Sequence, residues 1–452
     1  MARVRKRDLL HGDVRKLLIQ MALPLMAFNL VSVLYGYVDT HYISSLGELQ
    51  VGAVSIMNNI NLCGSAFATG LSAAGMALMS SALGAGQRRR ASHIATLLFA
   101  IAMAIAFLIS GGCALFSRQL LTLLKTPEDI FEYAREYLLG LAPSFLFTYI
   151  LTIFQALRQS NGDSRSAVAL NIIATLLNVV LDPLLIFRLN LGMLGASLAT
   201  SLSKMLVCPI ALFGMLDSHQ EVSVDFRRYG FDRSILKQII HTALPASLGS
   251  FMMEFGFIIM NSFILSHGSI IMSAYSLGNK ISSPFYVPVN ALSAALVPFI
   301  GQAVGAGDNK RARQCYRQAM ILSLEVSAVL LAIGIPLAPL LAHLLVGEAS
   351  PEMLENGIIY GRFSIGTIVF MVWVNNILAM FNGSGHTRSS LFINLLRLWL
   401  LRLPLLIFFG SCTDLGPLGI WMAMILSNLF CGIISQIWYS VHFSRLYPIS
   451  KA

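Results

Sequence analysis

The stretch from Asn171 to Phe187 reads NIIATLLNVVLDPLLIF, an apolar run that carries one line of polar side chains. The polar residues recur every three or four positions and therefore share one face of a helix: Asn171, Thr175, Asn178 and Asp182. The remaining residues are apolar enough for lipid or for the interior of a helix bundle. A carboxylate at such a depth is costly unless it faces a cavity or a partner. The stretch therefore predicts a membrane helix with a functional acid at Asp182.

Pro183 directly follows this acid. A proline inside a helix frees the carbonyl four residues earlier, here that of Val179, from its backbone hydrogen bond. A carboxylate, an amide, a hydroxyl and a free carbonyl would then lie together, and a hard cation or a proton relay uses such groups. For Asn171 and Thr175 we favour ordinary interhelical hydrogen bonds instead.

The composition indicates a polytopic membrane protein. Of 452 residues, 56% are hydrophobic and only 12% are charged, with a mean hydropathy of +0.73, whereas soluble proteins have roughly 25% charged residues. The apolar runs are continuous rather than alternating, which favours helices over a barrel. The six cysteines form no Cys-x-x-Cys pair, so neither a disulfide framework nor a zinc site is expected. We expect no cofactor.

The formal charge of +10 reflects orientation in the membrane rather than a nucleic-acid partner. About twelve spans are expected, beginning near residues 17, 49, 94, 132, 165, 192, 238, 271, 318, 355, 389 and 417. With the N-terminus inside, 22 basic residues fall on the cytoplasmic side and 4 on the opposite side. The positive-inside rule therefore predicts that both termini are cytoplasmic.

The second half of the chain repeats motifs of the first half in the same order and at a nearly constant spacing. An Ala-Leu-Pro motif ends at Pro24 and again at Pro245, and a Gly-Ala-Gly motif begins at Gly84 and again at Gly305. Because six spans separate the copies, matching features lie on the same side of the membrane, as in a parallel repeat. The first span of each half also contains a proline. We predict hinges at Pro24 in the first span and at Pro183 in the fifth span.

The fold class expected from this repeat is all-α, with twelve transmembrane helices in two six-helix lobes. We place the first lobe at residues 1–216, a cytoplasmic linker at 217–237 and the second lobe at 238–452. A parallel repeat relates the lobes by a pseudo-twofold axis normal to the membrane.

A second acid, Asp39, lies in the first span, four residues after Tyr35 on the same helical face. It is expected at the depth of Asp182, and Thr200 on the sixth span approaches from the same side. Two neighbouring carboxylates at low dielectric need a proton or a metal ion between them. The alternatives are a water-exposed Asp39 and a Thr200 bonded to its own helix.

These residues resemble the multidrug and toxic compound extrusion (MATE) family. The resemblance rests on Asp39-Thr40, the Asn178 to Phe187 block, the turn from Gly195 to Thr200 and the paired loops ending at Arg165 and Arg388. It covers essentially the whole chain and implies a transporter that exchanges protons or sodium ions for organic, often cationic, compounds. In the DinF-like branch the implied cation site, with sodium a possible occupant, consists of Asp39, Asn178, Asp182 and Thr200.

The second half departs from the family's pattern. Glu254 occupies the seventh-span acid position of the NorM-like branch, but the tenth-span aspartate of that branch is missing and Asn375 stands in its region. The candidates for contacts with substrate are Tyr35, Glu254 and Asn375. The alternative for Glu254 is a structural ion pair with a base such as Lys280.

The leading functional hypothesis is a monomeric antiporter in the cytoplasmic membrane that exports amphipathic organic compounds by alternating access. Its partners are small organic molecules and the bilayer. A flippase for lipid-linked saccharides is the second hypothesis, although cationic residues within the spans are few. A membrane-embedded enzyme ranks last, because no nucleophile paired with a base appears within the spans.

Overall fold

The computed structural model describes residues 9–124, 126–217, 220–345, 350–413 and 415–446. About 88% of these residues are helical, and they contain no strand. Eleven of their helices are long and apolar enough to cross a membrane. A twelfth span results if α11 (Pro351–Gly366) and α12 (Ile368–Gly383), which bend by 44°, count as one. The predicted all-α polytopic fold is therefore confirmed, while both chain ends lie outside the described residues.

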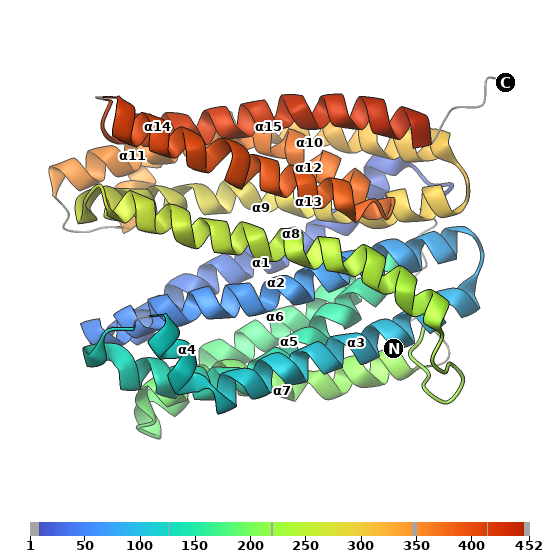
Figure 1. Ribbon diagram of the computed structural model, residues 1–452, viewed down its shortest axis with the longest axis horizontal. Coiled ribbons are helices and arrows are strands. Elements are labelled where there is room, and N and C mark those ends of the chain that lie inside the picture. Colours follow the sequence, from blue (N-terminus) through green and yellow to red (C-terminus); the bar gives the residue numbers. More distant parts are fainter. Residues whose placement is uncertain (1–8, 125, 218–219, 346–349, 414, 447–452) are drawn as a thin grey trace. The chain divides into compact units, whose positions relative to one another are not determined.

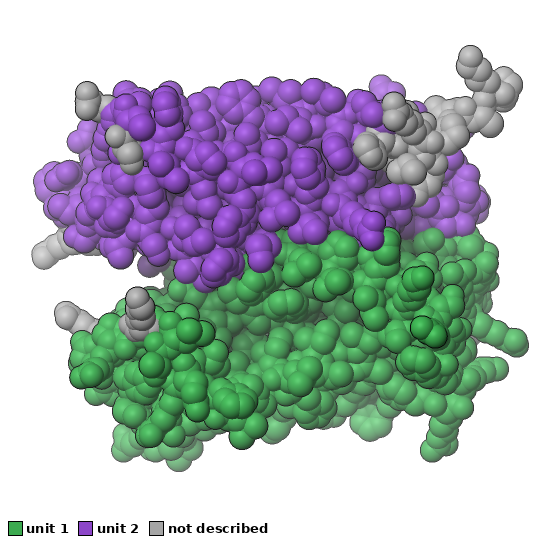
Figure 2. Space-filling model, viewed as in Figure 1, with its two compact units in different colours: residues 1–7, 27–251 green, residues 8–26, 252–452 purple. Residues whose placement is uncertain are grey.

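The chain divides into two compact units, coloured separately in Figure 2. Unit 1 comprises residues 1–7 and 27–251, and unit 2 comprises residues 8–26 and 252–452. Both boundaries fall within helices, α1 (Val14–Ser44) and α8 (Arg233–Leu265), rather than in the segment 217–237. The two lobes drawn from the sequence, and the axis between them, thus stay predictions.

Unit 1 is built around one central helix, α5 (Glu128–Ser160; Figure 1). Its further helices are α2 (Glu48–Gly84), α3 (Arg88–Leu115), α4 (Ser117–Leu123), α6 (Ser164–Pro183), the π-helix η1 (Leu184–Arg188) and α7 (Gly192–Leu216). The central α5 packs against α2, α3 and α7. Gly140 permits this packing, because a Cβ there would lie 2.1 Å from Ser197 Oγ on α7.

Unit 2 has a comparable arrangement around α9 (Ser269–Gly305). Its other elements are α10 (Asn309–Leu345), α11, α12, α13 (Thr387–Leu395), the π-helix η2 (Leu396–Arg402), α14 (Leu403–Cys412) and α15 (Pro417–Leu446). Helix α9 packs against α10, α11 and α12. Of its most apolar 18-residue window 72% is buried, against 22% for α1 and 28% for α8. The two helices that pass between the units are therefore much less buried than α9.

The sequence repeat extends to the elements. Helices α2 and α9 each contain 37 residues and occupy the same place in the two halves. Each half also contains a π-helix near a proline: η1 directly follows Pro183, and η2 ends two residues before Pro404. π-Helical turns are rare and occur frequently at functional sites.

The start of α1 is anchored in unit 2. Arg15 forms an ion pair with Glu325 on α10. The guanidinium of Arg311, also on α10, donates hydrogen bonds to the carbonyls of Leu9 (3.1 Å) and Gly12. The N-terminal turn of α1 is thus tied to a helix that is distant in the sequence.

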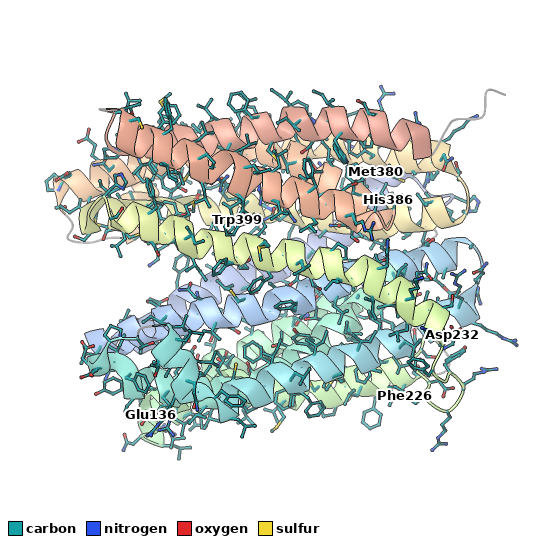
Figure 3. All side chains as sticks on the ribbon, in the orientation of Figure 1. Glu136, Phe226, Asp232, Met380, His386 and Trp399 are labelled. Carbon is teal, nitrogen blue, oxygen red and sulfur yellow. The ribbon has the colours of Figure 1, made fainter. Side chains whose placement is uncertain are left out.

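The segment before α8, by contrast, is held by unit 1. The amides of Ser223 and Asp225 donate to the hydroxyls of Ser92 (3.2 Å) and Thr96 (3.0 Å) on α3. Figure 3 labels two residues of this segment, Phe226 and Asp232, near the start of α8. The predicted linker is therefore an ordered segment along its described residues.

Candidate cation-coupling site

The candidate site in unit 1 is formed by two helices. Tyr35 and Asp39 lie one turn apart on α1, and Asn178 and Asp182 lie one turn apart on α6. Asp182 is 0% exposed and Asn178 is 4% exposed, whereas Tyr35 and Asp39 are half-buried. Three of the four predicted cation-site residues and one substrate candidate thus come together.

Hydrogen bonds connect all four side chains. The Tyr35 hydroxyl donates to Asp39 Oδ1 at 3.2 Å and lies 3.5 Å from Asp182 Oδ2. The Asn178 amide donates to Asp182 Oδ1 at 2.8 Å. A single phenol therefore bridges two carboxylates that come from different helices, α1 and α6.

This bridge has a consequence for protons. A tyrosine hydroxyl supplies one O–H donor, so it can donate to only one of the two carboxylates at a time. A second hydrogen bond, to the phenol oxygen, requires a proton on the other carboxyl group. The geometry thus suits a pair of acids that holds one proton between them.

The backbone at Asp182 is set by the change from α-helix to π-helix. Pro183 ends α6, and η1 begins at Leu184. Gly195 on α7 lets the two helices approach closely, because a Cβ there would lie 2.8 Å from the Leu185 carbonyl oxygen. A larger residue at Gly195 would displace η1 and with it the carboxylate of Asp182.

Thr200 is not bonded to the cluster. Its hydroxyl donates to the carbonyl of Ala196 on its own helix, at 3.4 Å. The same local bond occurs at Thr175, which donates to Asn171 at 2.9 Å. Asn171 itself donates to Gln155 on α5 at 3.2 Å, as expected for an interhelical contact.

One residue of the site was not expected from the sequence. Tyr137 on α5 is 9% exposed and lies within electrostatic range of both Asp39 and Asp182. Its only sequence signal is a phenol inside a span, which also occurs at structural positions. In the part of the chain that the structure describes, no group of three or more His, Cys, Asp or Glu residues could hold a metal.

The candidates in the second half lie apart from this cluster in the sequence and in their bonding. Glu254 on α8 is half-buried and forms no ion pair within the described residues. Asn375 on α12 donates to Asn290 Oδ1 at 3.0 Å. Its neighbour Asn376 is fully buried and accepts from Ser293 at 3.2 Å. Neither candidate is part of a group of acids.

Comparison with known proteins gives consistent matches over almost the whole chain. The MatE family model matches residues 24–184 and 245–408. A protein of Shewanella oneidensis named "FAD transporter" is 28% identical, with 95% of each chain covered. The "Probable multidrug resistance protein YpnP" of Bacillus subtilis is 27% identical, with 96% of each chain covered.

A solved structure shares the fold. It is titled the outward-facing conformation of a multidrug resistance MATE family transporter of the MOP superfamily. Its TM-score is 0.93 at 23% identity, covering 98% of this chain and 99% of the other. The chain therefore has the fold of that transporter structure.

Proposed function

Because the chain belongs to the MatE family, whose members are transporters rather than enzymes, we propose that it is a secondary active antiporter that exports organic compounds. The secondary transporter role follows from the family. The coupling ion, the direction and the cargo are the proposal. The DinF-like branch stays a prediction from Asp39, Asn178 and Asp182.

The observation that carries the proposal is the bridge from Tyr35 to Asp39 and Asp182. We assign coupling to this pair, with a proton as the coupling ion. An unpaired carboxylate within a membrane costs at least ~2.5 kcal/mol even on the most lenient scale. Loss of the shared proton therefore raises the free energy of this conformation and favours another.

The position of the pair explains how protonation could drive a conformational change. Asp39 lies on α1, which passes from unit 2 to unit 1, whereas Asp182 lies on α6 within unit 1. Loss of the shared proton replaces the hydrogen-bonded contact that Tyr35 makes between Asp39 and Asp182 by repulsion between two carboxylates. This change acts on α1, the helix that connects the units. Pro24, two residues before the boundary in α1, is the proposed hinge, and Pro183 is the second.

Sodium is the alternative coupling ion. The oxygens of Asp39, Asp182, Asn178 and Tyr35 are hard ligands that suit it. Thr200 would have to exchange its bond to Ala196 for the ion. Since one shared proton would satisfy both contacts of Tyr35 while Thr200 keeps its bond to Ala196, we favour the proton.

The proposed cargo is an amphipathic organic compound. The relatives named for multidrug resistance and for FAD transport support organic cargo. For a cationic compound, Glu254 on α8 supplies a negative partner. The excess of basic residues in the predicted inner loops supports an orientation with both termini inside. We further propose that the protein lies in the cytoplasmic membrane as a monomer.

The test is export from proteoliposomes. Purified protein is reconstituted at matched density, and efflux of a fluorescent amphipathic compound is measured under an imposed proton or sodium gradient. We expect export with the proton gradient, and its loss in Asp39→Asn and Asp182→Asn. With an uncharged fluorescent compound as cargo, Glu254→Gln is the matched control, since it neutralises an acid outside the cluster.

The control also decides where coupling occurs. If Glu254→Gln alone abolishes export, coupling lies in the second half and the proposal fails. If the sodium gradient alone drives export, the assignment of the proton is wrong while that of the site stands.

A further inference from the structure

A cavity of about 140 Å³ lies within unit 2. An engineered cavity of about 150 Å³ admits a benzene molecule, whereas sites for whole drug-sized ligands have roughly 300 Å³ or more. The cavity can therefore hold one ring or one charged group of a larger molecule. We call it the Arg402 cavity, after the charged side chain in its lining.

Aromatic rings form a large part of its wall. Tyr360 and Trp421 have ring centroids 4.3 Å apart, and Tyr275 stacks on Trp421 at 6.2 Å with an angle of 8° between the planes. All three rings are buried. Such a wall favours a flat, unsaturated group.

The polar part of the lining has more donors than acceptors. Arg402 is 7% exposed; its Nε donates to Ser427 Oγ at 3.0 Å and its Nη2 to Asn428 Oδ1 at 2.7 Å. A guanidinium has five N–H donors, so these two bonds orient it without using all of them. The indole N–H of Trp421, fully buried, has no hydrogen-bond partner within the described residues.

The charge of this lining is also uncompensated. No lining residue is an Asp or Glu, and Arg402 takes part in no ion pair of the described residues. Arg397, on the same π-helix, is 7% exposed, and its Nη1 lies 3.6 Å from the sulfur of Met371, which lines the cavity. Buried charges normally have a partner, because taking them out of water is costly.

We propose that the Arg402 cavity binds the carboxylate or phosphate of an unsaturated, anionic molecule. Arg402 would donate to its oxygens, and the aromatic wall would contact its ring. The inference rests on the proposed function, because it names the charge of one class of exported compound. The same anionic chemistry is found in lipid headgroups, which are the second source to be tested.

The experiment measures binding without any gradient. Full-length protein in phosphatidylcholine nanodiscs is titrated with 4-nitrobenzoate, 4-nitrobenzamide and 4-nitrobenzylammonium, which share a ring and differ in charge. Nitro groups quench tryptophan fluorescence, and Trp421→Phe identifies the part of the signal that comes from the cavity. We expect the benzoate to bind about ten-fold more tightly than the amide, as for a charge-assisted hydrogen bond, and the ammonium to bind weakest.

Substitutions locate the effect. Arg402→Gln should remove the ten-fold preference, and Arg402→Lys should retain part of it, because lysine keeps the charge but not the fork of donors. Arg388→Gln, an exposed position on α13, is the matched control and should keep the preference. Ile425→Phe keeps Arg402 and adds no tryptophan but fills space at a lining residue, and it should weaken the binding of all three probes.

Two results would overturn the inference: equal affinity for the benzoate and the amide in the unsubstituted protein, or an unchanged preference in Arg402→Gln that elutes as a folded monodisperse species. Phosphatidylglycerol in the nanodisc distinguishes the two sources. Competition with the benzoate supports a lipid headgroup, and its absence supports a soluble anion. Since Asp39→Asn should bind the probes normally, failure of coupled export and failure of this site are separable.

Discussion

Each half of the described chain has a buried charged side chain close to a proline and a π-helix, and the two side chains have opposite charges. In the first half, Asp182 precedes Pro183, where α6 changes to η1. In the second half, Arg402 ends η2 two residues before Pro404. Both side chains are buried. The π-helix follows the proline in the first half and precedes it in the second, so the halves share a helical irregularity near a proline but not its position. The chemistry placed there is a separate property of each half.

The partners of the two charges differ in a second way. Asp182 is bonded through Tyr35 to α1, which passes between the units, whereas Arg402 is bonded to Ser427 and Asn428 on α15, within unit 2. A change of charge at Asp182 is thus felt by a connecting helix. A ligand at Arg402 meets a site whose walls belong to one unit. The first arrangement suits coupling and the second suits recognition.

The largest expected effect is at the acids. Asp39→Asn should lower gradient-driven export about a hundred-fold. It removes the ionised form, whose burial costs at least ~2.5 kcal/mol and so drives the conformational change. Export from proteoliposomes measures this, and binding of 4-nitrobenzoate to the same protein should be unchanged. A loss of both activities would show that the two halves are not chemically separate.

Tyr35→Phe should have the next largest effect. It removes the hydroxyl that bridges two carboxylates, and hydrogen bonds to charged groups are worth about 1.5–3 kcal/mol. We expect export to slow roughly ten-fold under a proton gradient. Tyr42→Phe is the control, since Tyr42 lies on the same helix and contacts Phe187 through its ring, at 6.2 Å. Equal effects of both changes would remove the phenol bridge from the mechanism.

Asn178→Ala should act in the same direction but less strongly. It removes a neutral donor at 2.8 Å from Asp182 and leaves both acids in place. A slowing of about five-fold, or ~1 kcal/mol, is expected from the loss of one hydrogen bond. Export rates at matched reconstitution check it, and a loss as large as that of Asp39→Asn would assign Asn178 an indispensable role.

The smallest effect is expected at the hinge. Pro24→Ala restores a backbone donor near the boundary between the units and should slow export about three-fold with little change in expression, because a kinked helix that needs to bend would become stiffer. Pro209→Ala, in α7 within unit 1, is the matched control. Export at the unsubstituted rate in Pro24→Ala would refute the hinge.

Local spacing predicted much of this structure. The apolar runs located the spans, and the i, i+4 pairs placed Tyr35 with Asp39 and Asn178 with Asp182. Thr200 illustrates the limit: a threonine in a helix can donate to its own backbone, and spacing does not reveal whether it does. The bridge from Tyr35 to Asp182 depends on packing between distant helices.

The second half shows the same limit more strongly. The sequence marks Arg402 as a basic residue within a span, but its partners Ser427 and Asn428 and the ring of Trp421 come from another helix. No periodicity within η2 or α15 indicates that they enclose a cavity. The boundaries of the units likewise depend on contacts between residues that are distant in the sequence.

The anchoring of α1 in unit 2 has a consequence for biosynthesis. Arg15 is synthesised 310 residues before its partner Glu325. At about 5–20 residues per second, the start of α1 waits roughly 15–60 s for the helix that holds it. Residues 27–251 of unit 1 are complete well before then. The start of α1 can therefore form its contacts with α10 only after α10 has been synthesised. The remainder of α1, which belongs to unit 1, does not depend on that step.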